Sequence, residues 1–332
     1  MTPGECVKTG SVTLFHPSRT LNAYQAALAF EESHLLRHFE TGFYDVPRNP
    51  LRRMLSILPT RRNVTLEREL KRRRQEGLSS KYVRSHWLWD SLFTLSARLR
   101  LPRPFEERIV LFRNERFDAK VAGHLLECRP RAVMGYDTCC LKTFEACQSI
   151  GALRILEQVV GHAAAGAAIL EEERRLHPDW ADSIPPHDVD RLVDRCLAEV
   201  RQADFVLAPS DYVRDTLIQA GVDSSKIVSM PYGVDIERFQ PKFEIVRGRF
   251  RVLFVGQIGQ RKGVKYLLEA WKRLGLQDAD LILVGKVVGR GLGLRNYTQL
   301  FRHVPSVPHW EIQSYFQAAD LFVFPSLHEG SA

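Results

Sequence analysis

The sequence lacks the features that mark several common protein classes. Its six cysteines include no C-x-x-C pair, which argues against a disulfide scaffold or a zinc module and favours reduced thiols. The most apolar stretch, residues 159–170, is broken by Gly161, His162 and Gly166 and is too short for a bilayer, which takes about 20 residues. No charged and apolar leader opens the chain. These absences predict a cytoplasmic protein, with peripheral attachment to the inner face of a membrane as an open possibility.

The composition is that of an ordinary globular protein. Hydrophobic residues make up 45% of the chain and charged residues 26%, close to the averages of globular domains. A length of 332 residues exceeds one ordinary domain and favours two.

The net charge of +8 is concentrated between residues 48 and 74. Such a basic stretch attracts phosphates, acidic lipid head groups or nucleic acid. Apolar residues are interleaved with the arginines, so the stretch is consistent with docking on an anionic membrane. A solvated helical face is equally consistent with it. Nucleic acid is not expected, because no aromatic stacking residues are interleaved. The arginines assigned to the membrane surface are Arg52, Arg53, Arg61, Arg62, Arg72, Arg73 and Arg74.

Apolar runs, turns and amphipathic helices alternate along most of the chain. Strands are expected at 12–16 and 250–255, and a helix at 264–274. A first helix is expected from a cap at Ser18 to about residue 38, followed by a strand at 41–44. This alternation predicts the α/β class, with parallel sheets covered by helices.

A Pro-Tyr-Gly-Val-Asp segment at 231–235 interrupts the alternation and indicates an interdomain connection. The predicted domains are 1–235, with an Arg-rich helical insertion at about 48–108, and 236–332. A doubly wound domain usually contains more strands than the second segment supplies, so this domain is expected to be incomplete.

The most informative segment is 252–271, with the sequence VLFVGQIGQRKGVKYLLEAW. A buried strand ends at Gly256, a loop follows, and Arg261-Lys262-Gly263 leads into a helix. Glycines let a ligand approach the backbone, and a helix start offers free N–H groups and a positive dipole end. Lysine adds a point charge suited to phosphate. The segment predicts a phosphate site, with an ordinary strand–helix turn as the alternative.

Five segments, in order along the chain, resemble the retaining glycosyltransferases of family four (group 1), which have the GT-B fold. They are ADFVLAPSDYVRDTLIQAG, PYGVD, FVGQIGQRKGVKYLLEAW, LILVG and AADLFVFPSLHEGSA, the last beginning an E-x7-E motif. The resemblance is firm from about Leu153 to Ala332. It implies two Rossmann-like doubly wound domains, one for the acceptor and one for the donor. It also implies sugar transfer from a nucleotide-sugar to a glycan or lipid-linked acceptor with retained configuration, in polysaccharide or glycoconjugate synthesis.

The resemblance also implies roles for individual residues. Lys262 would bind the donor pyrophosphate, helped by Arg261 and the amides near Gly263. Glu329 matches the first glutamate of E-x7-E, which contacts the hydroxyls of the transferred sugar. His162 falls where the family often has a histidine facing that sugar, and a helix-capping or core histidine is the alternative.

Three further positions complete the expected donor site. Gly256 ends the strand before the phosphate loop. Gln257 stands where the family commonly has an arginine, and so loses a charge-assisted contact of about 1.5–3 kcal/mol. Gly285 follows LILV, near the expected nucleoside, although a turn glycine is equally consistent.

The second glutamate of the motif would fall beyond Ala332. The chain is therefore expected to be truncated within the motif. A catalytically inactive truncated paralogue, which only binds nucleotide or phosphate, remains the alternative to an active enzyme.

No metal and no cofactor are expected. The two D-x-D sequences, at 188–190 and 278–280, lie at a helix start and a strand start, and aspartate is favoured as a cap at a helix start. Lys262 and helix dipoles would neutralise the leaving diphosphate instead. A Rossmann dehydrogenase is not favoured, because no glycine-rich turn follows the first strand.

Overall fold

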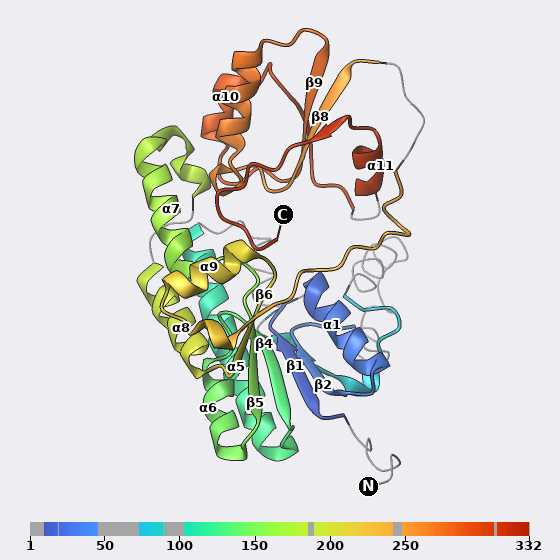
Figure 1. Ribbon diagram of the computed structural model, residues 1–332, viewed down its shortest axis with the longest axis vertical. Helices are drawn as coiled ribbons and strands as arrows, with labels where there is room; N and C mark the ends of the chain where they lie inside the picture. Colours follow the sequence, from blue (N-terminus) through green and yellow to red (C-terminus); the bar gives the residue numbers. More distant parts are fainter. Residues whose placement is uncertain are drawn as a thin grey trace, which may run out of the picture. The chain divides into compact units, whose positions relative to one another are not determined.

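Figure 1 shows the computed structural model of the chain. It describes residues 10–18, 20–45, 73–88, 90, 103–184, 189–241, 248–308 and 311–331. The described chain forms two compact units. The described residues within 1–159, 191–207 and 222–228 form the first, and those within 160–190, 208–221 and 229–332 form the second. Most of the Arg-rich segment, including Arg52, Arg53, Arg61, Arg62 and Arg72, lies outside the described residues.

The first unit is built on a seven-stranded sheet with the order β3-β2-β1-β4-β5-β6-β7. The pairings of β1 with β2 and β4, of β2 with β3, and of β5 with β4 and β6 are all parallel. The strands are β1 (Val12–His16), β2 (Leu36–Thr41), β3 (Val83–Ser85), β4 (Ala132–Tyr136), β5 (Leu153–Glu157), β6 (Phe205–Ala208) and β7 (Ile227–Ser229). The predicted parallel α/β architecture is confirmed here.

Helices connect these strands, as the alternation predicts. They are α1 (Leu21–Glu32), α5 (Arg103–Cys128), α6 (Leu141–Ile150) and α8 (Val189–Gln202), with short 3₁₀ turns η1 (Ser80–Tyr82) and η3 (Ser224–Lys226). Leu14 and Phe15 on β1 have no exposed surface, because a parallel strand is covered on both faces.

The first helix and the strand after it differ from the prediction. Helix α1 begins after Thr20 rather than Ser18, and it ends at Glu32 instead of continuing to residue 38. The chain turns at His34, which has φ 58°, and forms β2 where helix was expected. The expected strand at 41–44 is therefore displaced. Pairing of β2 with β1 buries Leu36 and Phe39, and this tertiary gain outweighs the local helical pattern.

The second unit has a four-stranded parallel sheet with the order β10-β9-β8-β11. Its strands are β8 (Phe250–Val255), β9 (Ala279–Val284), β10 (Arg302–Val304) and β11 (Leu321–Phe322). Its helices are α7 (Ala163–Leu176), α9 (Asp211–Gln219), α10 (Val264–Leu274) and α11 (Ile312–Gln317), with 3₁₀ segments η2 (Pro178–Ser183), η4 (Gln260–Lys262) and η5 (Leu292–Tyr297). The strand at 250–255 and the helix at 264–274 are confirmed.

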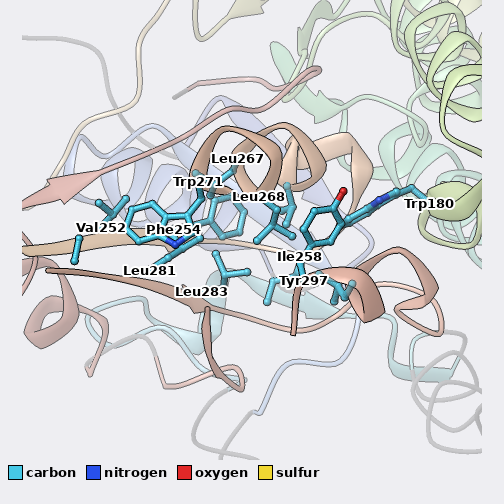
Figure 2. Close-up of a cluster of buried hydrophobic side chains, with 13 residues drawn as sticks. Trp180, Val252, Phe254, Ile258, Leu267, Leu268, Trp271, Leu281, Leu283 and Tyr297 are labelled. Carbon is cyan, nitrogen blue, oxygen red and sulfur yellow. The ribbon is translucent and has the colours of Figure 1, made fainter. Parts of the chain in front are cut away.

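The core of the second unit lies between α10 and the sheet. Figure 2 shows Phe254 of β8 and Leu283 of β9 against Trp271 of α10. Trp180 of η2 joins the same cluster, with its ring centroid 6.4 Å from that of Tyr297. Residues 160–190 and 208–221 thus pack in this unit although they precede the predicted connection at 231–235. The domain boundary at 235/236 remains a prediction.

Candidate functional site

The candidate site begins where β8 and β9 end side by side. Gly256 has φ 155° and Gly285 has φ 148°. A Cβ atom on residue 285 would lie 1.8 Å from the carbonyl oxygen of Gly256, so only glycine allows the two turns to approach this closely. The structure therefore gives Gly285 a turn role, and its predicted place beside a nucleoside remains a prediction. Gln257 is exposed in the loop.

The loop continues through η4 to Gly263, the residue that caps α10. Gly263 has φ 65°, and a Cβ atom there would lie 1.9 Å from the carbonyl oxygen of Pro325. Leu327 donates its backbone N–H to the carbonyl of Arg261 at 3.0 Å. The start of α10 and the segment after β11 are thus in direct backbone contact, although more than 60 residues separate them.

The predicted cations and the predicted acid meet at this contact. The ammonium of Lys262 forms an ion pair with Glu329 Oε2, and Arg261 Nη1 lies 3.4 Å from the same oxygen. Arg261 Nη1 also donates to the carbonyl of His328 at 2.9 Å. The Lys262 ammonium lies 4.8 Å from the ring centroid of Phe324. Two cations and one carboxylate therefore converge beside the first turn of α10.

The Lys262–Glu329 pair is shielded from solvent. The two side chains are only 12% and 25% exposed, so their attraction is less screened than that of a surface pair. Burial by itself raises the pKa of Glu329, but the hydrogen bond from Lys262 and the charges of Lys262 and Arg261 outweigh it and lower that pKa. Glu329 is consequently ionised at neutral pH. An incoming anion would compete with this carboxylate for both cations.

A buried network fixes the loop from behind, and sequence reasoning missed it. Gln260 has no exposed surface, and its Nε2 donates to Glu173 Oε2 at 2.5 Å. Glu173 also accepts a hydrogen bond from Tyr266 Oη at 2.7 Å, and Gln260 N donates to Ser183 Oγ at 2.9 Å. In the run EEERR, Glu173 has the pattern of a solvated helix face, so no local signal could have found it.

Replacing Glu173 by alanine is expected to lower the free energy of unfolding by about 1–3 kcal/mol. The substitution leaves the buried amide of Gln260 without its acceptor. A buried donor without a partner costs more free energy than the loss of both partners of a hydrogen bond. Urea denaturation of the full chain measures the change. Glu172→Ala, an exposed neighbour on the same helix, is the control. Equal effects of the two substitutions would contradict the assigned role of the network.

His162 lies at the N-terminus of α7 and is fully buried. Its Nδ1 accepts the backbone N–H of Ala164 at 3.3 Å, and the backbone N–H of His162 donates to Thr216 Oγ1 at 2.9 Å. Burial lowers its pKa, so the ring is neutral at pH 7. Its Nε2 has no hydrogen-bond partner within the described chain. The structure thus shows a helix cap, and the role toward a donor sugar remains a prediction.

His328 is a second buried histidine that the sequence did not single out. Its Nδ1 lies 2.7 Å from Tyr212 Oη, and a Cβ atom on residue 166 would lie 2.6 Å from its Nε2. Burial, and then the charge of Arg261, lower its pKa. Gly161 N donates to the carbonyl of Glu329 at 3.2 Å. Glycines 161 and 166, which break the apolar stretch, leave room for the His328 ring, next to Glu329 in the chain.

Neither D-x-D sequence offers a metal site in the described residues. Asp280 is held in an ion pair with Arg249 at 2.8 Å, and Asp188 lies outside the described residues. Neither sequence is part of a group of three metal-ligating side chains in the part of the chain that the structure covers. The absence of a metal from the reaction remains an expectation.

The basic stretch is described only at its end. Arg73 pairs with Asp90 at 2.7 Å, and its guanidinium lies 5.3 Å from the ring centroid of Phe43, whereas Arg74 is exposed. Arg73 therefore contributes to the packing of the first unit. Among the described helices, none has the length and apolar character needed to cross a membrane.

Comparison with known proteins supports the predicted class. Residues 249–332 match the family model described as glycosyl transferases group 1. The D-inositol 3-phosphate glycosyltransferase of Pseudarthrobacter chlorophenolicus is 28% identical over 146 residues, which cover 38% of this chain and 35% of that protein. The match therefore spans about a third of the length of this curated relative.

Solved structures show the same fold along most of the chain. Sucrose-phosphate synthase from Thermosynechococcus elongatus superposes with a TM-score of 0.59 at 13% identity, covering 97% of this chain and 77% of that chain. HepE from Anabaena, in complex with UDP, gives a TM-score of 0.54 at 14% identity. The superposition covers 96% of this chain and 74% of the HepE chain. The fold is that of GT-B glycosyltransferases. The family indicated by the motifs is thus also the one whose model matches residues 249–332.

Proposed function

We propose that the protein is a glycosyltransferase that takes its sugar from a nucleotide-sugar. The observation that carries the proposal is the convergence of Lys262, Arg261 and Glu329 at the first turn of α10. Cations and free helix N–H groups suit a diphosphate, and a carboxylate beside them suits the hydroxyls of a sugar. The HepE structures with UDP and with UDP-glucose support this choice of donor.

The residues divide the chemistry between them. When the diphosphate occupies the cations, the Lys262–Glu329 pair opens and Glu329 becomes free to accept hydrogen bonds from the sugar. As the bond to the sugar breaks, negative charge grows on the leaving diphosphate, and Lys262 and Arg261 stabilise it in a partly shielded site. Gln257 adds no charge to this loop.

The finer parts of the proposal follow from the family resemblance. Transfer proceeds with retention, and the leaving phosphate accepts the proton of the incoming hydroxyl on the same face of the sugar. The acceptor is a glycan or a lipid-linked saccharide in polysaccharide or glycoconjugate synthesis. A cytoplasmic protein that touches the inner face of the membrane through its basic segment would meet such an acceptor.

A thermal-shift screen with UDP-, GDP- and ADP-sugars on the full chain tests the donor site. One nucleotide class is expected to raise the melting temperature, and a ligand at 100 times its Kd stabilises by about 2.7 kcal/mol. Release of nucleoside diphosphate with a mixture of saccharide acceptors then tests transfer. No response to any of the three classes would contradict the proposal, and binding without release would favour the inactive paralogue.

A further inference from the structure

A second group of side chains with ligand chemistry lies in the first unit, apart from the proposed donor site. His38 on β2 and His124 and Cys128 on α5 each offer one ligand atom, and these three atoms lie within 4.8 Å of one another. Two imidazoles and one thiolate are ligand types that Zn²⁺ takes in proteins. We propose that His38, His124 and Cys128 bind a zinc ion that joins β2 to the last turns of α5.

The backbone places these residues for a common ligand. His124 and Cys128 are four residues apart on α5 and so lie on one face of the helix. A tetrahedral zinc ion with Zn–N of about 2.0–2.1 Å and Zn–S of about 2.3 Å requires ligand atoms roughly 3.3–3.6 Å apart. The ligand atoms would therefore have to move closer together when the ion binds. Cys128 is only partly buried, so water can enter as the fourth ligand.

Glu40 provides the support that zinc-binding histidines usually have. Its Oε1 is hydrogen-bonded to His124 Nδ1, and its Oε2 lies 2.7 Å from His86 Nε2. A carboxylate on Nδ1 fixes the tautomer and leaves Nε2 as the metal ligand. Glu40 is fully buried, so its negative charge acts on the cluster with little screening.

His38 has a ring nitrogen that no other described group uses. Its Nδ1 is shielded from solvent and has no hydrogen-bond partner among the described residues. A buried polar atom without a partner is costly, and a metal ion would satisfy it.

The charges around the cluster are compatible with a divalent cation, and the types of ligand select among the divalent metals. The positive charge of Arg84 acts on His38 and that of Arg37 acts on Cys128, so both oppose a cation. The carboxylate of Glu40 and a thiolate at Cys128 offset them. A thiolate and two imidazoles suit zinc or cobalt and not magnesium or calcium, which take oxygen ligands.

Titration of the metal-free full chain with Zn²⁺ and Co²⁺ tests the site. We expect one ion per chain, a higher melting temperature with zinc, and a Co²⁺ spectrum with tetrahedral bands and a thiolate-to-cobalt charge-transfer band. Cys128→Ser should remove the charge-transfer band, and His38→Gln should weaken binding. Glu40→Gln should weaken zinc binding by about 10- to 100-fold through His124. His34→Gln, an exposed histidine just before β2, should change none of these.

Two results would overturn the proposal. One is the absence of both stoichiometric zinc and the thiolate band in the unsubstituted protein, which needs no variant to fold. The other is unchanged metal binding in a His38→Gln, Cys128→Ser double variant that keeps the circular dichroism of the parent. Neither readout involves a nucleotide-sugar, so failure of the zinc site and failure of the transferase proposal are separate outcomes.

Discussion

Gly263→Ala is expected to abolish donor binding and to lower the free energy of unfolding by about 2–5 kcal/mol. Gly263 has φ 65°, where a residue with a side chain costs about 1–2 kcal/mol. The added Cβ would also lie 1.9 Å from the carbonyl oxygen of Pro325, a backbone atom that cannot rotate away. Relief of this clash requires the segment that carries Glu329 to move off the start of α10.

The other end of α10 supplies the matched control. Gly275 has φ 58°, but no heavy atom lies within 4 Å of the Cβ that alanine would add. Gly275→Ala should therefore show only the backbone cost, and it should bind nucleotide-sugar like the parent. Urea denaturation and the thermal response to the donor measure both effects. If the two substitutions behave alike, the close contact between α10 and Pro325 does not hold the site together.

Lys262→Ala is expected to lower kcat/KM by about 100- to 1000-fold, the cost of removing one group that stabilises transition-state charge. Its side chain is only 12% exposed and forms an ion pair with Glu329. Arg261 lies 3.4 Å from the same carboxylate and would keep part of the diphosphate affinity. The effect should consequently appear in kcat as well as in donor binding.

Lys265→Ala is the control for charge alone. Lys265 lies one turn further along α10, where it pairs with Glu269 at 3.7 Å. The loss of Lys265 changes the net charge as much as the loss of Lys262 does. It removes none of the three side chains, Lys262, Arg261 and Glu329, that meet beside the first turn of α10. Initial rates of nucleoside diphosphate release at several donor concentrations compare the two variants. A similar, small loss in both would show that Lys262 has no direct contact with the donor.

The strand–loop–helix from 250 to 274 could be predicted because its signals are local. An apolar run, two glycines and an amphipathic helix follow one another, and each depends on neighbours a few residues away. The same reasoning was wrong at residues 33–38. Whether that stretch becomes helix or strand depends on pairing with β1, which no nearby residue reveals.

Sequence reasoning also missed residues whose partners are far along the chain. Gln260 and Glu173 are 87 positions apart, and the histidines that contact Glu40 come from 46 and 84 positions further along. Rules based on spacing search for ligands close together in the sequence, so they do not bring His38, His124 and Cys128 to notice. These three side chains come from a strand and a distant helix.

The sequence by itself determined the parallel α/β class and indicated the phosphate loop and the family resemblance, because these depend on periodicity and on short ordered motifs. Only the tertiary structure decided that Glu329 pairs with Lys262, that His162 caps α7 and that His38 faces α5. These contacts arise when parallel strands and their crossover helices bring remote segments together. Burial then determines which polar groups are paired, which are neutral and which have no hydrogen-bond partner among the described residues.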